Sequence, residues 1–157
     1  MQLITTHSGC LQLRFKARPP PIGCTEWPAG RVLLEWAVRE VPTSGATVLE
    51  FGSGIGTTAL GFALATRAQG AGSPSTIIAT DVCSQSLDNL KRNAACNAIP
   101  VSDAGYPQAA TVRVGLWDAS EGQAAVRRLR KDFGPSLSSQ FPALLVLLSK
   151  SFKIGWK

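Results

Sequence analysis

Apolar residues recur along this chain at spacings that predict alternating strands and helices. Four short apolar runs have the length and composition of strands: 47–51, 76–80, 111–116 and 141–148. Four stretches carry apolar residues at helical spacing: 25–40, 57–67, 84–97 and 123–133. Pro28 suits a first helical turn, and Ser84 is placed to cap the third helix.

Strands that alternate with helices imply a parallel sheet with right-handed crossovers. We therefore expect an α/β protein with a Rossmann-like, doubly wound, mostly parallel sheet, whose ligand crevice lies beyond the carboxyl ends of the strands. Its domain would span residues 25–157. Residues 1–24 should form an irregular segment with a short strand near 11–15, and residues 99–110 should form a loop.

Composition and charge narrow the class of protein. The 157 residues, 45% of them hydrophobic and 17% charged, suit one folded domain. The net charge of +6 would suit nucleic acid, but the basic residues form short groups without interleaved aromatics. We interpret them as a solvated face and do not favour a nucleic-acid partner, although methylation of nucleic acid stays an open alternative. The longest aliphatic run, Ala143–Leu148, is far shorter than the roughly 20 residues that span a bilayer, so we expect no membrane partner.

The cysteines and the histidine indicate no metal site. The chain has 4 cysteines, scattered without a C-x-x-C pair, and His7 is its only histidine, so we expect no metal. Scattered cysteines fit a reducing compartment, and the sequence begins without the charged and apolar pattern of a signal peptide. We predict a cytoplasmic protein, and a nuclear location also fits.

A glycine-rich turn, E-F-G-S-G-I-G from Glu50 to Gly56, joins the first strand of this domain to the next helix. Glycine adopts positive φ and lets a ligand approach the backbone. A phosphate-binding P-loop would need a lysine before Ser or Thr, which this turn lacks. A dinucleotide fold favours G-x-G-x-x-G, whereas here the glycines run G-x-G-x-G and Glu50 would repel a pyrophosphate.

S-adenosylmethionine suits the turn better, because its methionine end carries a sulfonium and an ammonium. Glu50 would neutralise that end, and the turn from Gly52 to Gly54 would make room for it. Asp81, at the end of the next strand, would accept the ribose hydroxyls, and Trp117 and Asp118 would contact the adenine. Singly, Trp117 could be a core residue and Asp81 a helix cap, but together these residues favour the cofactor.

Several stretches resemble a known family: T-E-W-P-A-G-R-V-L-L-E-W-A, V-L-E-F-G-S-G-I-G, A-T-D-V, L-D-N-L-K-R-N-A-A-C-N and V-G-L-W-D. They are similar to the seven-strand, class I S-adenosylmethionine-dependent protein-lysine methyltransferases grouped near nicotinamide N-methyltransferase. The resemblance implies a protein lysine as acceptor, S-adenosylmethionine as cofactor, and a structural role for Asn93 and Asn97. It also implies these cofactor-site residues: Trp27, Gly52, Ser53, Gly54, Asp81 and Trp117. With Glu50, Gly56 and Asp118 they make up the predicted site.

In that family the acceptor pocket follows the fourth strand, in a stretch that reads like D-x-x-Y. Here residues 141–157 read F-P-A-L-L-V-L-L-S-K-S-F-K-I-G-W-K, where Lys150 and Lys153 would repel a lysine substrate. We therefore assign no catalytic residue. We expect a shortened methyltransferase with a divergent tail from about Phe141 and a sheet incomplete on its C-terminal side. Two alternatives stay open: a catalytically inactive cofactor- or partner-binding protein, and a NAD-dependent oxidoreductase.

Overall fold

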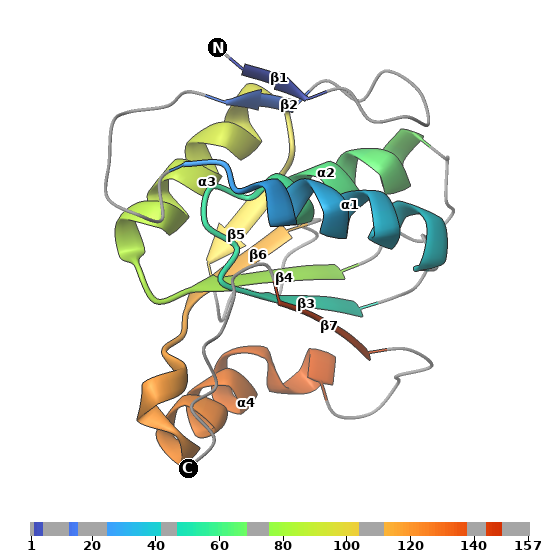
Figure 1. Cartoon of the computed structure of the whole chain (residues 1–157). Coiled ribbons are helices and arrows are strands. Elements are labelled where there is room, and N and C mark those ends of the chain that lie inside the picture. The colour runs from blue at the N-terminus through green and yellow to red at the C-terminus, as the bar shows by residue number, and fades with distance from the viewer. Residues whose placement is uncertain are drawn as a thin grey trace.

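A computed structural model gives the fold and describes residues 2–4, 13–15, 25–41, 47–68, 76–103, 112–137 and 144–148. Within these residues, the centre of the molecule is a five-stranded parallel sheet in the order β5-β6-β4-β3-β7 (Figure 1). The strands are β3 (Thr47–Phe51), β4 (Thr76–Asp81), β5 (Val101–Asp103), β6 (Val112–Leu116) and β7 (Leu144–Leu148). This sheet confirms the predicted Rossmann-like α/β class.

Helices cover both faces of the sheet, as a doubly wound fold requires (Figure 1). The helices on one face are α1 (Pro28–Glu40), α2 (Thr57–Ala68) and α3 (Ser84–Cys96), and the other face carries α4 (Gln123–Leu137). A short 3-10 helix, η1 (Ala119–Glu121), precedes α4. The strand order reverses beside β3, with β4 on one side and β7 on the other. The carboxyl end of β3 is therefore where such folds bind ligands.

Two local expectations are wrong. Residues 101–103 lie in the predicted loop but form β5, which pairs in parallel with the start of β6. Three residues are too few to show the alternation that marks a strand in sequence. Ser84 does not cap α3: the N-cap is Cys83, without a side-chain cap hydrogen bond, and its N–H donates to Asp81 Oδ1 at 2.9 Å.

The N-terminal segment contains a small second sheet. β1 (Gln2–Ile4) pairs antiparallel with β2 (Leu13–Phe15), so the strand expected near residues 11–15 is present as β2. The sequence did not reveal β1, which is again only three residues long. This small sheet contacts α2 and α3 on the outer side of the helical layer (Figure 1).

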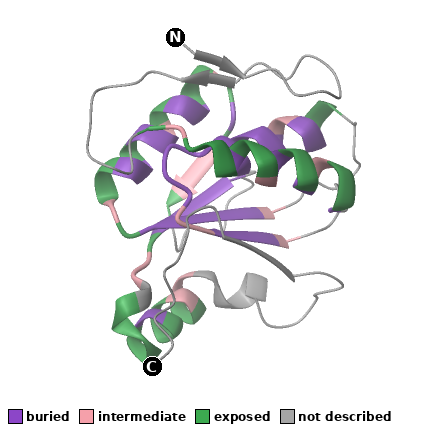
Figure 2. Ribbon diagram, viewed as in Figure 1, coloured by how far each residue is buried: buried purple, intermediate pink, exposed green. Residues whose placement is uncertain are grey.

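The core lies on both faces of the central strands. Val48 and Ile77 join the larger buried cluster, whereas their neighbours Leu49 and Ile78 form a smaller one. Successive strand residues point to opposite faces, so β3 and β4 need apolar residues at consecutive positions. Figure 2 shows buried residues in the strands and along most of α2, whereas α1 and α3 carry exposed residues on their outer sides.

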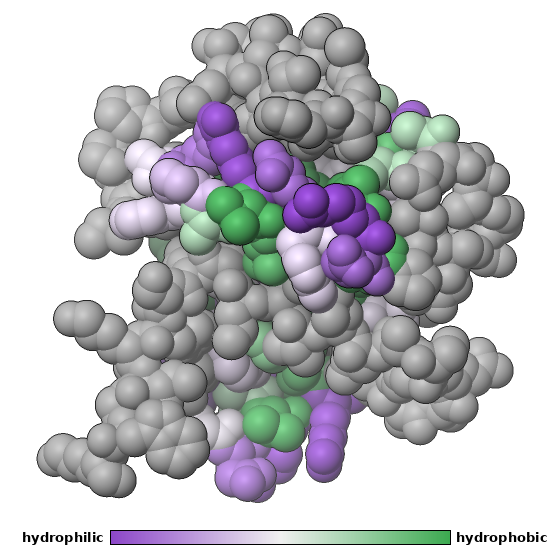
Figure 3. Space-filling view, turned by 45° about the vertical axis from the view of Figure 1, so that its right-hand side comes forward, coloured by the Kyte–Doolittle hydropathy of each residue, from purple (hydrophilic) through white to green (hydrophobic). Residues whose placement is uncertain are grey.

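The first two helices pack closely, and this packing positions one wall of the candidate site. A Cβ atom added at Gly61 of α2 would lie 2.4 Å from Leu34 Cδ2 of α1, so the helices meet where α2 has no side chain. The outer face of α1 mixes apolar and charged residues, among them the exposed Val32 and Trp36, and the surface in Figure 3 shows the same mixture. In the described residues, no helix is both long and apolar enough to cross a membrane.

Candidate functional site

The glycine turn after β3 depends on backbone conformations that favour glycine. Gly52, Gly54 and Gly56 have φ angles of 70°, 55° and 90°, in the left-handed region. The N–H of Ser53 donates to Thr80 O at 2.9 Å, which ties the turn to the end of β4. The repeated glycine of the sequence motif therefore reflects three backbone positions that other residues would strain.

Asp81 fixes the turn from the neighbouring strand. It is buried at the end of β4, and its Oδ2 accepts a hydrogen bond from the N–H of Gly54 at 2.8 Å, while its Oδ1 accepts that of Cys83. One carboxylate thus connects the glycine turn to the start of α3. A carboxylate can accept about four hydrogen bonds, so these two do not by themselves exclude a ligand hydroxyl.

The side chain of Asn93, on α3, also holds the glycine turn in place. Its side-chain amide donates to Ile55 O at 3.0 Å, and the Asn97 amide donates to Asn93 O at 2.7 Å. A Cβ atom at Gly56 would lie 2.8 Å from Leu90 Cγ, so this glycine also allows close packing on α3. The two asparagines therefore have the structural role that the resemblance implied.

A hollow of about 280 Å³, its open mouth included, lies between the glycine turn and the start of α1. It has ten lining residues: Thr25, Trp27, Gly30, Glu50, Gly52, Ser53, Gly54, Ile55, Thr57 and Thr58. Five of them belong to the predicted set: Trp27, Glu50, Gly52, Ser53 and Gly54. Of the other five, Thr25 and Gly30 reach the turn only through the packing of α1 on α2, whereas Ile55, Thr57 and Thr58 lie in the turn or follow it directly.

The polar groups of the hollow favour a ligand with a cationic part. Glu50 is 1% exposed and lines the hollow, and its main-chain oxygen accepts a hydrogen bond from Thr80 Oγ1 at 2.9 Å. A carboxylate on this wall makes the local potential negative, which favours a cation. Ser53 Oγ is buried and has no hydrogen-bond partner among the described residues, so it is available to a ligand.

The remaining predicted residues do not line this hollow. Trp117 stacks on Phe51 with ring centroids 4.2 Å apart, and the backbone N–H of Trp117 donates to the backbone oxygen of Asp81 at 3.0 Å. Asp118 Oδ1 accepts the N–H of Ser120 at 2.8 Å, and hydrogen bonds from Ser120 lower the pKa of the Asp118 carboxyl. Asp118 therefore shapes the turn into η1, and Trp117 packs at the carboxyl edge of the sheet next to Asp81.

Two exposed apolar residues beside Asp81 were not predicted. Val82 follows Asp81 directly, and Leu116 is the residue of β6 that pairs with Asp81 in the parallel register. Both side chains are exposed at the carboxyl edge of the sheet. In sequence, an apolar residue at the end of a strand is indistinguishable from core.

No cluster of metal ligands was found in the part of the chain that the structure describes: nowhere in it do three side chains of His, Cys, Asp or Glu come together. The stretch after β7, with Lys150, Lys153, Phe152 and Trp156, lies outside the described residues. The structure therefore describes the proposed cofactor side of the site and not the predicted acceptor side.

A protein-family model described as lysine methyltransferase matches residues 8–124. The fold is similar to a candidate RNA methyltransferase from Pyrococcus horikoshii, with 19% identity and a TM-score of 0.47 over 69% of this chain and 48% of that one. It is also similar to the tRNA (uracil-54, C5)-methyltransferase of Pyrococcus abyssi in complex with S-adenosyl-L-homocysteine, with 15% identity and a TM-score of 0.40 over 66% and 26%.

The chain therefore spans less than half the length of each of these two solved structures. No curated protein matches it in sequence.

Proposed function

Because this chain belongs to the lysine methyltransferase family, we propose that it binds S-adenosylmethionine on its glycine turn and transfers the methyl group to a protein lysine. One observation carries the cofactor part: the hollow combines a glycine turn, the buried carboxylate of Glu50 and the buried hydroxyl of Ser53. These groups suit a ligand end that holds positive charge and hydrogen-bonding atoms.

The methionine end of the cofactor would occupy the hollow. Glu50 would balance the charge of the ammonium and sulfonium, and Ser53 Oγ would gain the hydrogen bond that it lacks within the described chain. The positive φ angles of Gly52 and Gly54 keep side chains out of this space. When bound, S-adenosylmethionine supplies a methyl group on its sulfonium.

The adenosine end would follow the carboxyl edge of the sheet away from the hollow. The Asp81 carboxylate would accept a ribose hydroxyl while still holding the N–H of Gly54. The exposed side chains of Val82 and Leu116 would pack against the adenine ring, and removing this apolar surface from water would favour binding. Trp117 and Asp118 would border this end.

Methyl transfer is an in-line displacement in which the protein mainly positions a neutral amine and excludes water. The acceptor lysine must lose its proton, which an apolar or carboxylate-lined pocket promotes. We assign that step to no residue of this chain. The proposal therefore rests on the cofactor half of the site and on family membership.

A thermal melt with S-adenosylhomocysteine tests the cofactor part. At about 100 times its dissociation constant, the ligand should add roughly 2.7 kcal/mol to the free energy of unfolding. Glu50→Gln should abolish most of this gain, whereas Glu35→Gln, at an exposed position of α1, should leave it unchanged. Absence of any shift in the unmodified chain would refute cofactor binding, and a shift with NADH alone would favour the oxidoreductase alternative.

Turnover tests the transfer itself. The chain is incubated with S-adenosylmethionine bearing an isotope-labelled methyl group and a protein extract, and labelled methyl-lysine is sought by mass spectrometry. Label that depends on Glu50 would establish a lysine methyltransferase. Binding of S-adenosylhomocysteine without any transfer would instead favour the inactive, cofactor-binding alternative.

A further inference from the structure

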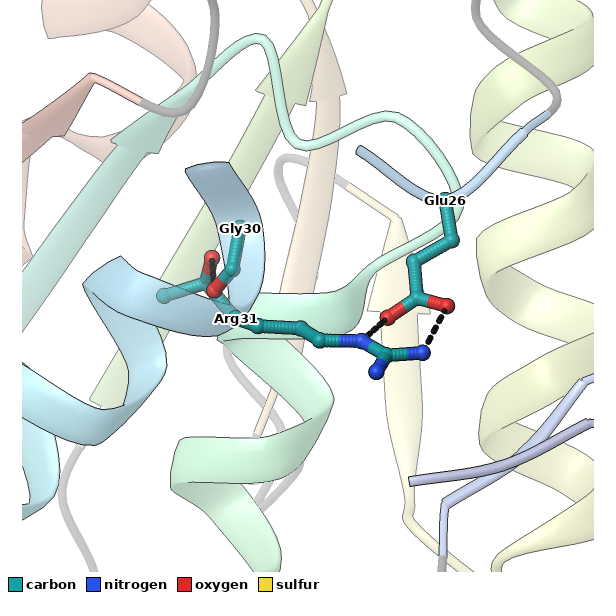
Figure 4. A network of polar contacts seen from close by, with 4 residues as sticks. Glu26, Gly30 and Arg31 are labelled. Atoms are coloured by element: carbon teal, nitrogen blue, oxygen red, sulfur yellow. Dashed lines mark hydrogen bonds and ion pairs between the residues drawn. The ribbon is translucent and has the colours of Figure 1, made fainter. Parts of the chain in front are cut away.

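A bidentate ion pair bridges the start of α1, next to the hollow (Figure 4). Arg31 Nε donates to Glu26 Oε1, and Arg31 Nη2 donates to Glu26 Oε2 at 2.7 Å. Two parallel N–H···O bonds restrict the geometry more than one contact does. Because Glu26 precedes the helix and Arg31 lies in it, the pair closes a loop around Trp27 and Pro28.

The pair is better shielded than a typical surface ion pair. The Glu26 side chain is 8% exposed and the Arg31 side chain 44%. Fully exposed pairs contribute little, because water screens them and both side chains lose rotational freedom. Here the carboxylate is largely removed from water, so its contact with Arg31 holds the segment more firmly.

This restraint acts where helix α1 has no side-chain cap. Trp27 is the N-cap residue, with an extended conformation at φ −104° and ψ 135°, and makes no side-chain cap hydrogen bond. Its side chain is 47% exposed although it lines the hollow. Much of the Trp27 side chain therefore lies outside the core, and the backbone on both sides of it contributes to its position.

The other side of the loop is attached to α2. Gly30 O accepts a hydrogen bond from Thr58 Oγ1 at 3.2 Å, and a Cβ atom at Gly30 would lie 3.4 Å from Thr57 Cβ. Gly30 thus sits directly on the first turn of α2, and Figure 4 shows Glu26 reaching Arg31 just beside it. The ion pair adds a second attachment on the N-terminal side of Trp27.

We propose that Glu26 and Arg31 are positioning residues that hold Thr25 and Trp27 in place as a preformed wall of the hollow. The identity of the ligand rests on the proposed function, whereas the restraint itself does not. A wall ordered before binding spares the ligand the cost of ordering it, which is about 0.5–1.5 kcal/mol for each immobilised side chain. Loss of the pair should therefore loosen the segment and weaken binding.

The first measurement is ligand-free amide exchange of residues 25–33, followed by mass spectrometry. Glu26→Gln and Arg31→Gln should each raise exchange in this segment, which includes the N–H of Gly30 that donates to Trp27 O. The control variants Glu121→Gln and Arg128→Gln remove an ion pair 2.9 Å apart on η1 and α4, with a similarly exposed arginine (43%) and a more exposed carboxylate (35%), and should not change exchange in residues 25–33. Unchanged exchange in the Glu26 and Arg31 variants would overturn the proposal.

The second measurement is S-adenosylhomocysteine affinity by calorimetry. Each single variant of Glu26 or Arg31 should bind about 3- to 10-fold more weakly, and the double variant no more weakly than the singles. Arg31→Lys should also bind more weakly, because lysine keeps the charge but not the two-pronged contact. Faster exchange with unchanged affinity would overturn the positioning role. If the unmodified chain binds no S-adenosylhomocysteine, the proposed function fails, and exchange alone decides the inference.

Discussion

Replacing Gly61 by alanine tests how α1 is held against α2. A Cβ atom there would lie 2.4 Å from Leu34 Cδ2 and 2.8 Å from Leu34 Cδ1, closer than real Cβ contacts come. Leu34 is fully buried, so its side chain cannot swing into solvent. Gly61→Ala must therefore push the two helices apart or distort the Leu34 rotamer.

The expected magnitude follows from two opposing terms. Overpacking a buried contact costs about 1–3 kcal/mol. Replacing a helical glycine by alanine returns about 1 kcal/mol, because alanine is the better helix former. Gly61→Ala should therefore lower the free energy of unfolding by about 1 kcal/mol. In a Leu34→Ala background the clash disappears, so the same change should raise the free energy of unfolding by about 1 kcal/mol.

Urea denaturation, monitored by circular dichroism, measures the free energy of unfolding of the unmodified chain, the two single variants and the double variant. Leu34→Ala alone should cost about 2–5 kcal/mol. If that leaves too little stability to measure, Leu34→Val removes the two clashing methyl positions at a lower cost. A change of sign between the two backgrounds is the expected result. Additivity of the two substitutions within about 0.5 kcal/mol would refute the contact between Gly61 and Leu34.

Two further predictions concern the end of β4. Asp81→Asn leaves a single oxygen for the two N–H groups of Gly54 and Cys83, so it should cost about 1–3 kcal/mol in urea denaturation; a loss below about 0.5 kcal/mol would contradict the role of Asp81 in the turn. The side chain and backbone of Ser86 lower the pKa of the Cys83 thiol from its ordinary 9.0, so at neutral pH Cys83 should react with iodoacetamide faster than the more exposed Cys96. The advantage should shrink in Ser86→Ala and as pH rises past 9.0, where a lowered pKa no longer increases the thiolate fraction of Cys83; peptide mass spectrometry measures both rates.

The order of elements was predictable because each is determined locally. Apolar runs bounded by glycine, proline or an acid gave β3, β4 and β6, and helical spacing gave α1 to α4. The strands β1 and β5 were missed since three residues carry too little pattern. The elements that periodicity revealed are those long enough to repeat it.

In the candidate site, too, the residues that the sequence revealed are those whose role is set locally. The turn glycines and Glu50 were identified in sequence, because backbone conformation and charge point to their role without knowledge of their neighbours. The sequence did not reveal the hydrogen bond between Asp81 and Gly54 or the contact of Gly30 with Thr58. It also did not reveal the exposed apolar side chains of Val82 and Leu116. The two hydrogen bonds link residues 27 and 28 positions apart, which no local pattern encodes.

Local sequence patterns were enough to predict the α/β class, the glycine turn and the sign of the charge beside it. The closure of the hollow by the segment from Thr25 to Gly30, and the packing of Gly56 on Leu90, are seen only in the folded chain. The difference follows from the range of the interactions. Propensity, periodicity and φ preference act within a few residues, whereas a pocket wall exists only once distant helices pack.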